Sequence, residues 1–123
     1  MNRYDLEERT AKFGEDVIVF CRSIKQDAIT RPLINQIVKS STSIGANYME
    51  ANAASSEKDF KNKIHICKKE SQETTHWLRM LRSCQLDEQC IHETERLNKE
   101  ATEIILIFGK VLSTIKHKIT TPA

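Results

Sequence analysis

The chain has 123 residues, a length that suits one domain with a single hydrophobic core. Only 3 glycines and 2 prolines are present, which is too few turn formers for the many short strands of an all-β fold. The 19 Lys and Arg nearly balance the 17 Asp and Glu, so the net charge of +2 does not by itself indicate a nucleic-acid partner.

Two long helices are predicted in the first half of the chain, over residues 5–26 and 32–53, because apolar side chains recur there at the helical period. Pro32 suits the first position of the second helix, where its missing N–H is not needed. The middle of that helix, residues 40–46, is rich in small side chains that would let another backbone approach closely. The inward-facing residues are expected to be Leu6, Thr10, Phe13, Val17, Phe20, Cys21, Ile24, Leu33, Ile34, Ile37, Ser41, Ile44 and Tyr48.

Two further helices are predicted over residues 57–85 and 88–118, with Ser56 and Asp87 as their N-caps. Their inward-facing residues are expected to be Phe60, Ile64, Cys67, Ser71, Thr74, Leu78, Leu81, Leu97, Ala101, Ile104, Ile105, Phe108, Val111, Leu112, Ile115 and Ile119. Short connections make sequential helices antiparallel neighbours. The sequence therefore predicts an all-α, up-down antiparallel four-helix bundle, with residues 1–123 forming one domain.

Several apolar residues fall outside these inward faces. Leu106 and Ile107 lie off the main stripe of the fourth helix, and Ile66, Trp77 and Met80 lie off that of the third. Contiguous apolar patches are uncommon on small monomers, so this pattern favours a subunit interface in a homo-oligomer. The alternative is a scatter of ordinary exposed apolar residues.

The clearest charge pattern lies on the third helix, opposite its core stripe. We call this set the basic stripe: Lys58, Lys61, His65, Lys68, Lys69, Gln72, His76 and Arg79. It covers roughly six turns, or on the order of 30 Å. Such a stripe could follow a phosphate backbone of RNA or DNA by charge and shape, since few aromatic residues accompany it for base stacking. The alternative is an ordinary solvated helix face.

A polar cluster is expected where the second and third helices pair, formed by Asn47, Glu50, Glu70 and Glu73. Glu73 and His76 make one Glu-x-x-His pair, whereas a di-metal bundle site needs such a pair on each of two helices. We therefore predict no metal here, and expect the cluster to form polar contacts between helices or subunits.

No residues suggest catalysis or a cofactor. Cys84, Cys90 and His92 do not have zinc-site spacing, and the sequence shows neither a nucleophile on a sharp turn nor a glycine-rich phosphate loop. The acidic N-terminal residues show no secretory signal, and the longest apolar run, residues 104–108, is far too short to span a membrane. We thus expect a non-enzymatic cytoplasmic protein with reduced thiols and no membrane partner.

Three stretches, residues 38–51, 55–60 and 70–78, resemble the signature of the bacterial family of 23S rRNA intervening-sequence proteins. They contain a Thr-Ser-Ile-x-Ala-Asn run at 42–47, a Ser-rich turn, and Glu70 and Glu73 ahead of the Trp77-Leu78 pair. Asn47 and Glu50 also match motif positions. The resemblance implies a bacterial origin, an up-down bundle and a homopentameric ring. A related accessory protein of diversity-generating retroelements is a more basic pentamer that binds nucleic acid and a reverse transcriptase.

Two functions follow as hypotheses from the residues and the resemblance together. The first is a homopentameric helical-bundle protein that binds RNA or DNA through the basic stripe. The second is a scaffold ring with a polypeptide partner and no role in nucleic-acid binding.

Overall fold

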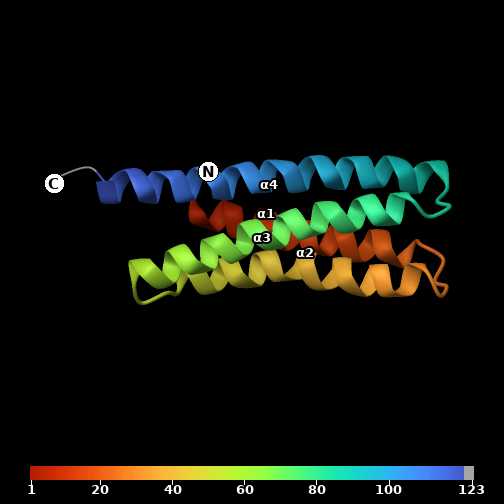
Figure 1. Ribbon diagram of the computed structural model, residues 1–123, viewed down its shortest axis with the longest axis horizontal. Coiled ribbons are helices and arrows are strands. Elements are labelled where there is room, and N and C mark those ends of the chain that lie inside the picture. The colour runs from red at the N-terminus through yellow and green to blue at the C-terminus, as the bar shows by residue number, and fades with distance from the viewer. Residues whose placement is uncertain (121–123) are drawn as a thin grey trace.

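The structure, a computed structural model, describes the backbone of residues 1–120 and the side-chain surroundings of residues 1–115. Its four helices are α1 (Arg3–Arg22), α2 (Thr30–Asn52), α3 (Glu57–Arg82) and α4 (Glu88–Thr120). They run up and down along one common axis, and short loops join them at alternating ends (Figure 1). The predicted all-α class and four-helix bundle are thus confirmed for the part of the chain that the structure describes.

The start of α1 is set by a capping box. The Asp5 N–H donates to Asn2 Oδ1 at 3.0 Å, and the Asn2 N–H donates back to Asp5 Oδ2 at 3.2 Å. These bonds satisfy N–H groups that have no partner within the helix, so α1 begins at Arg3, two residues before the predicted start. The helix ends at Arg22 rather than at residue 26, and the Ser23 Oγ hydroxyl donates to the Phe20 carbonyl at 2.6 Å.

The start of α2 differs from the prediction for a similar reason. The carboxylate of Asp27 accepts the N–H groups of Ile29 and Thr30, both at 2.8 Å. These bonds favour a start at Thr30, so Pro32 lies inside the first turn and does not open the helix. The predicted caps of the other two helices are present: the Asp59 N–H donates to Ser56 Oγ, and the Cys90 N–H donates to Asp87. The third helix ends at Arg82, three residues before the predicted 85.

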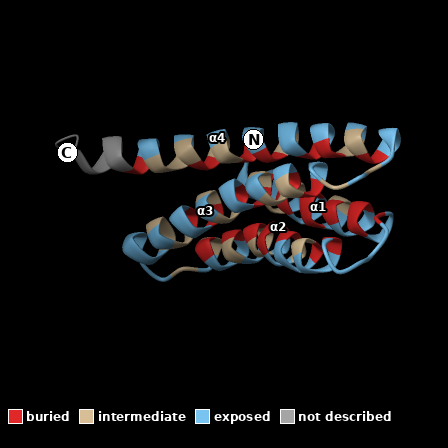
Figure 2. Cartoon of the chain, turned by 45° about the vertical axis from the view of Figure 1, so that its right-hand side comes forward, coloured by how far each residue is buried: buried red, intermediate tan, exposed pale blue. Residues whose placement is uncertain are grey.

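The buried faces of all four helices point to one central core (Figure 2). Every expected inward-facing residue among 1–115 is buried or half-buried, whereas Ile119 lies outside the residues whose side chains are described. Tyr48 of α2 and Phe108 of α4 meet with ring centroids 5.7 Å apart, so the core continues across the bundle. The α3 helix packs against both α2 and α4, and α1 packs more extensively on α2 than on α4.

Small residues bring α1 and α2 into close contact, as their sequence predicted. A Cβ built on Gly14 would lie 3.5 Å from the Ser41 carbonyl oxygen, and one on Gly45 would lie 3.4 Å from the Ala11 nitrogen. These distances leave room for a methyl group but not for a larger side chain. In contrast, a Cβ on Gly109 of α4 would meet no atom within 4 Å.

This difference predicts opposite effects of two glycine substitutions. Gly109→Ala should increase the free energy of unfolding by about 1 kcal/mol, because alanine is the better helix former and nothing obstructs its methyl group. Gly45→Leu should decrease it by roughly 1–3 kcal/mol, because the longer side chain forces α1 and α2 apart. Urea denaturation followed by circular dichroism measures both values. A neutral Gly45→Leu would contradict the close packing of these helices.

Candidate nucleic-acid interface

The basic stripe lies along α3 as one continuous face, away from the core. His65, Lys69, Gln72, His76 and Arg79 are exposed, as is Lys58 near the helix start. Lys61 and Lys68 are half-buried because they stand at the edge of the stripe. The structure therefore brings together all eight residues that the sequence placed on this face.

The cations of the basic stripe have no ion-pair partner among the side chains that the structure describes. This is true of Lys58, Lys61, Lys68, Lys69 and Arg79, while the ion pairs of the described chain involve other cations. The charge of an unpaired cation is not offset by a carboxylate in contact with it. The stripe is therefore a positive surface on a chain that is nearly neutral overall.

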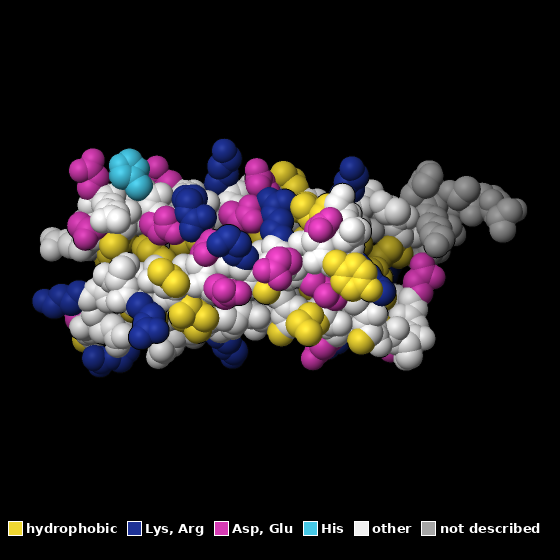
Figure 3. Space-filling view, turned by 180° about the vertical axis from the view of Figure 1, so that it is seen from behind, with side chains coloured by type: hydrophobic (Ala, Val, Ile, Leu, Met, Phe, Trp, Pro, Cys, Tyr) yellow, Lys and Arg dark blue, Asp and Glu magenta, His cyan; other side chains and the backbone are white. Residues whose placement is uncertain are grey.

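Three acidic side chains of α4, Glu93, Glu100 and Glu103, contact arginines at the seam with α1. Arg9 of α1 donates to both carboxylate oxygens of Glu100, at 2.8 and 2.6 Å, and to Glu103 at 2.6 Å. This contact lowers the pKa of Glu100 below its ordinary value, because the guanidinium favours the charged carboxylate. Arg96 likewise joins Glu93 of its own helix to Asp16 of α1. On this side of the bundle Lys, Arg, Asp and Glu are intermingled (Figure 3).

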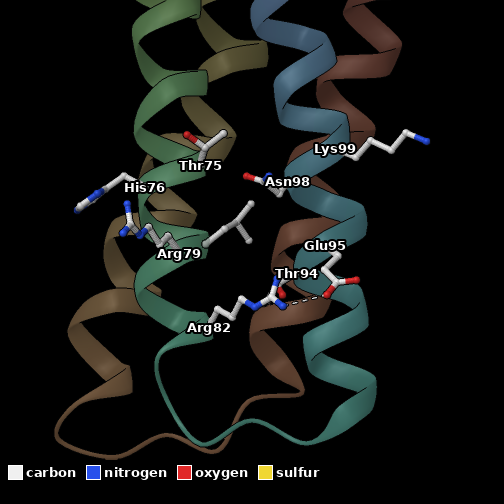
Figure 4. Close-up of a pocket in the computed structure, with 9 residues that line it drawn as sticks. Thr75, His76, Arg79, Arg82, Thr94, Glu95, Asn98 and Lys99 are labelled. Carbon is white, nitrogen blue, oxygen red and sulfur yellow. Dashed lines mark hydrogen bonds and ion pairs between the residues drawn. The ribbon is translucent and has the colours of Figure 1, made fainter.

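A pocket of about 610 Å³ lies between α3 and α4, beside the C-terminal end of the basic stripe. It is lined by Thr75, His76, Leu78, Arg79, Arg82, Thr94, Glu95, Asn98 and Lys99. Arg82 reaches across the pocket to Glu95, with Nη2 and Oε1 3.0 Å apart, and Asn98 points toward α3 (Figure 4). His76 and Arg79 extend from the outer side of α3, and Lys99 extends away from α3 (Figure 4).

Sequence reasoning found His76 and Arg79 but missed the other polar residues of this pocket. Arg82, Glu95, Asn98 and Lys99 are single polar residues on two helices, and no pattern within either helix marks them. The feature that brings these residues together is the antiparallel register of α3 against α4, which places Arg82 opposite Glu95.

The expected polar cluster is more dispersed in the structure than its sequence positions suggested. Glu50 makes a contact between helices, an ion pair with Lys63 of α3 at 2.6 Å. Asn47 donates to the Ser43 carbonyl of its own helix at 2.8 Å. The Glu70 and Glu73 carboxylates form no hydrogen bond with the side chains that the structure describes. Burial and the neighbouring Glu73 raise the pKa of Glu70.

Metal binding and thiol reactivity depend on the His, Cys, Asp and Glu side chains of the described residues. No group of three or more His, Cys, Asp or Glu side chains within residues 1–115 is placed to hold a metal ion. All four cysteines are free, and burial raises the pKa of Cys21 and Cys67 to about 12. A thiol with so high a pKa stays protonated at neutral pH and is a poor nucleophile.

The apolar residues predicted to lie outside the core fall into two groups. Leu106 is 68% exposed and Ile66 is 36% exposed, as expected for surface positions. Trp77 and Ile107, however, pack against the chain's own core, and Met80 is half-buried. The prediction that Trp77 and Ile107 project away from the core was therefore wrong. Each of their helices contacts two neighbours, which widens the face that is covered.

The described helices include none that is long and apolar enough to cross a membrane. Together these features define a class of protein, a helical bundle with one unpaired basic face. The chain belongs to the 23S rRNA-intervening sequence protein family, whose model matches residues 3–109. It is also similar to a solved protein of unknown function from the S23 ribosomal protein family of Bacteroides thetaiotaomicron VPI-5482.

That similarity has a TM-score of 0.74 and 29% sequence identity, and it covers 86% of this chain and 96% of the other. None of the curated proteins matches this chain. The family resemblance that the sequence indicated is thus confirmed.

The raised pKa of Glu70 predicts a pH-dependent effect on stability. The folded chain holds the Glu70 proton more tightly than the unfolded chain, so the protonated carboxyl favours the folded state at low pH. This contribution to the free energy of unfolding is lost as the pH rises above about 4.5 and through the raised pKa. Glu70→Gln should therefore increase the free energy of unfolding more at pH 7 than at pH 4. Urea denaturation at both pH values measures this, with the exposed Glu15→Gln as control. A loss of stability at pH 7 would show that the Glu70 charge has a favourable partner.

Proposed function

We propose that this protein is a non-enzymatic, homopentameric helical bundle that binds nucleic acid along the basic stripe of α3, in the cytoplasm of a bacterium. The observation that carries the proposal is the separation of charge. The carboxylates of α4 that face α1 are neutralised by Arg9 and Arg96, while the five Lys and Arg residues of the stripe lack such partners among the described side chains.

Charge and shape would provide the recognition. The stripe runs along most of the 26-residue helix α3, so several of its cations can contact successive phosphates of one strand. It contains no aromatic side chain other than its two histidines, which favours a helical duplex over unstacked bases. Binding of this kind is largely independent of sequence and weakens steeply with salt.

Assembly into a ring would repeat the stripe by symmetry and multiply the number of phosphate contacts. The exposed apolar side chains of Leu106, Met49 and Ile18 support an interface between copies, because residues of this kind are commonly covered in assemblies. The family membership also favours a role connected with RNA, since the family name refers to an intervening sequence in 23S rRNA.

The proposal predicts a specific loss of binding when exposed stripe cations are neutralised. The variant Lys58→Gln, Lys69→Gln and Arg79→Gln should bind a 20-base-pair RNA duplex much more weakly than the unaltered protein. The slope of log affinity against log salt should become shallower by roughly 2–3, about one for each lost phosphate contact. Fluorescence anisotropy across a salt series measures both quantities.

The matched control is the variant Lys25→Gln, Arg31→Gln and Lys110→Gln, which removes the same charge from exposed positions on other parts of the chain. It should bind nearly as well as the unaltered protein. Equal losses in both variants would indicate diffuse attraction rather than a site on α3. Sedimentation equilibrium in the same buffers tests for the mass of a pentamer.

The alternative function is a scaffold ring with a polypeptide partner. If the unaltered protein binds neither RNA nor DNA duplexes at low salt, affinity capture from the host lysate, with and without nuclease, tests this alternative. A partner that remains after nuclease treatment, and that is lost with Leu106→Asp, would support the scaffold.

A further inference from the structure

We propose that the pocket between α3 and α4 takes a backbone phosphate of the nucleic acid that lies along the basic stripe, held by Arg82 and Asn98. This inference rests on the proposed function and adds to it a defined anchoring point. Arg82 and Asn98 are residues that the stripe does not include.

The position of the pocket makes it a continuation of the stripe. Arg79 belongs both to the stripe and to the pocket lining, and His76 adjoins it one turn earlier on the same helix. The pocket therefore adjoins the C-terminal end of the stripe, on the side of α3 that faces α4. The volume of about 610 Å³ leaves space for a phosphate group and several water molecules.

Some hydrogen-bond donors of the pocket lining are already used, and others are not. The hydroxyls of Thr75 and Thr94 are used, because each donates to a carbonyl of its own helix at 2.6 Å. The Asn98 amide forms no hydrogen bond with the described side chains, and Asn98 points toward α3 (Figure 4). Guanidinium groups can donate two parallel hydrogen bonds to phosphate oxygens, which suits Arg82 to this ligand.

Glu95 holds Arg82 in place across the pocket. Only one N–H group of Arg82 is engaged, at 3.0 Å from Glu95, so its remaining donors are available to a ligand. Both partners of this ion pair are about half exposed, and ion pairs of that kind stabilise a protein little. A phosphate can therefore bind Arg82 together with Glu95, or replace Glu95 as its partner, with little loss of protein stability.

A second basic pocket, between α1 and α4, does not have the same property. It is lined by Arg9, Lys12, Arg96 and Lys99, but also by Asp16, Glu100 and Glu103. These carboxylates already bind the two arginines. The pocket between α3 and α4 has Glu95 as the one carboxylate in its described lining, and Glu95 engages one N–H group of Arg82.

The decisive test is a double substitution that keeps the net charge constant. Arg82→Gln with Glu95→Gln removes the pocket's guanidinium and its carboxylate together. We expect weaker binding to a 20-base-pair RNA duplex with 5′-hydroxyl ends, and a salt slope shallower by about 1. The matched control, Arg96→Gln with Glu93→Gln, removes an ion pair from the other side of α4 and should leave affinity and slope unchanged.

Two single substitutions strengthen the test. Glu95→Gln should tighten binding, because it frees Arg82 and removes the repulsion of the phosphate. Asn98→Ala should weaken binding without changing any charge. Thermal unfolding followed by circular dichroism checks that each variant is folded, and Asn98→Ala remains informative if the double variant is not.

The outcomes separate this inference from the proposed function. If stripe variants lose binding but the double variant keeps the affinity and slope of the unaltered protein, the pocket inference is overturned and the proposed function stands. If the unaltered protein binds no duplex at all, the proposed function fails. Inorganic pyrophosphate then tests the pocket alone: binding lost in the double variant but kept in the control supports it, and no binding overturns it.

Discussion

The placement of α3 between α2 and α4 is the constraint on which the rest of this structure depends. A helix with neighbours on two sides has one outward face left, and on α3 that face is the basic stripe. Its opposite face supplies Ile64, Cys67, Leu78 and Leu81 to the core. The long, uninterrupted helix between the Ser56 cap and Arg82 thus turns a pattern in sequence into a straight row of charges.

The distribution of acidic residues determines how positive the surface around the basic stripe is. A chain with a net charge of +2 can carry a positive face when its carboxylates lie on other faces. Glu100 and Asp16 lie at the α1–α4 seam, where they contact Arg9 and Arg96. The same contacts join two helices that otherwise pack less closely than the other neighbours, so they serve both the fold and the surface charge.

The sequence predicted the features that depend on helical period, and it failed where the outcome depends on the pairing of distant segments. The inward faces follow from spacing within one helix, and their expected residues among 1–115 are buried or half-buried. The starts of α1 and α2 were misplaced because the Asn2 and Asp27 side chains satisfy backbone N–H groups, an effect that apolar spacing does not reveal. The burial of Trp77 and Ile107, and the pocket formed by Arg82 and Asn98, require the register between helices, which one sequence does not provide.

The central claim is that nucleic acid lies along α3, and lysine footprinting tests it most directly. The protein would be acetylated with and without a 20-base-pair RNA duplex at low salt, and the modification of each lysine measured by mass spectrometry. The account predicts that the duplex protects Lys58, Lys61, Lys68 and Lys69, while Lys25 and Lys110 react as in the free protein. Equal protection of all lysines, or protection confined to those outside α3, would contradict it.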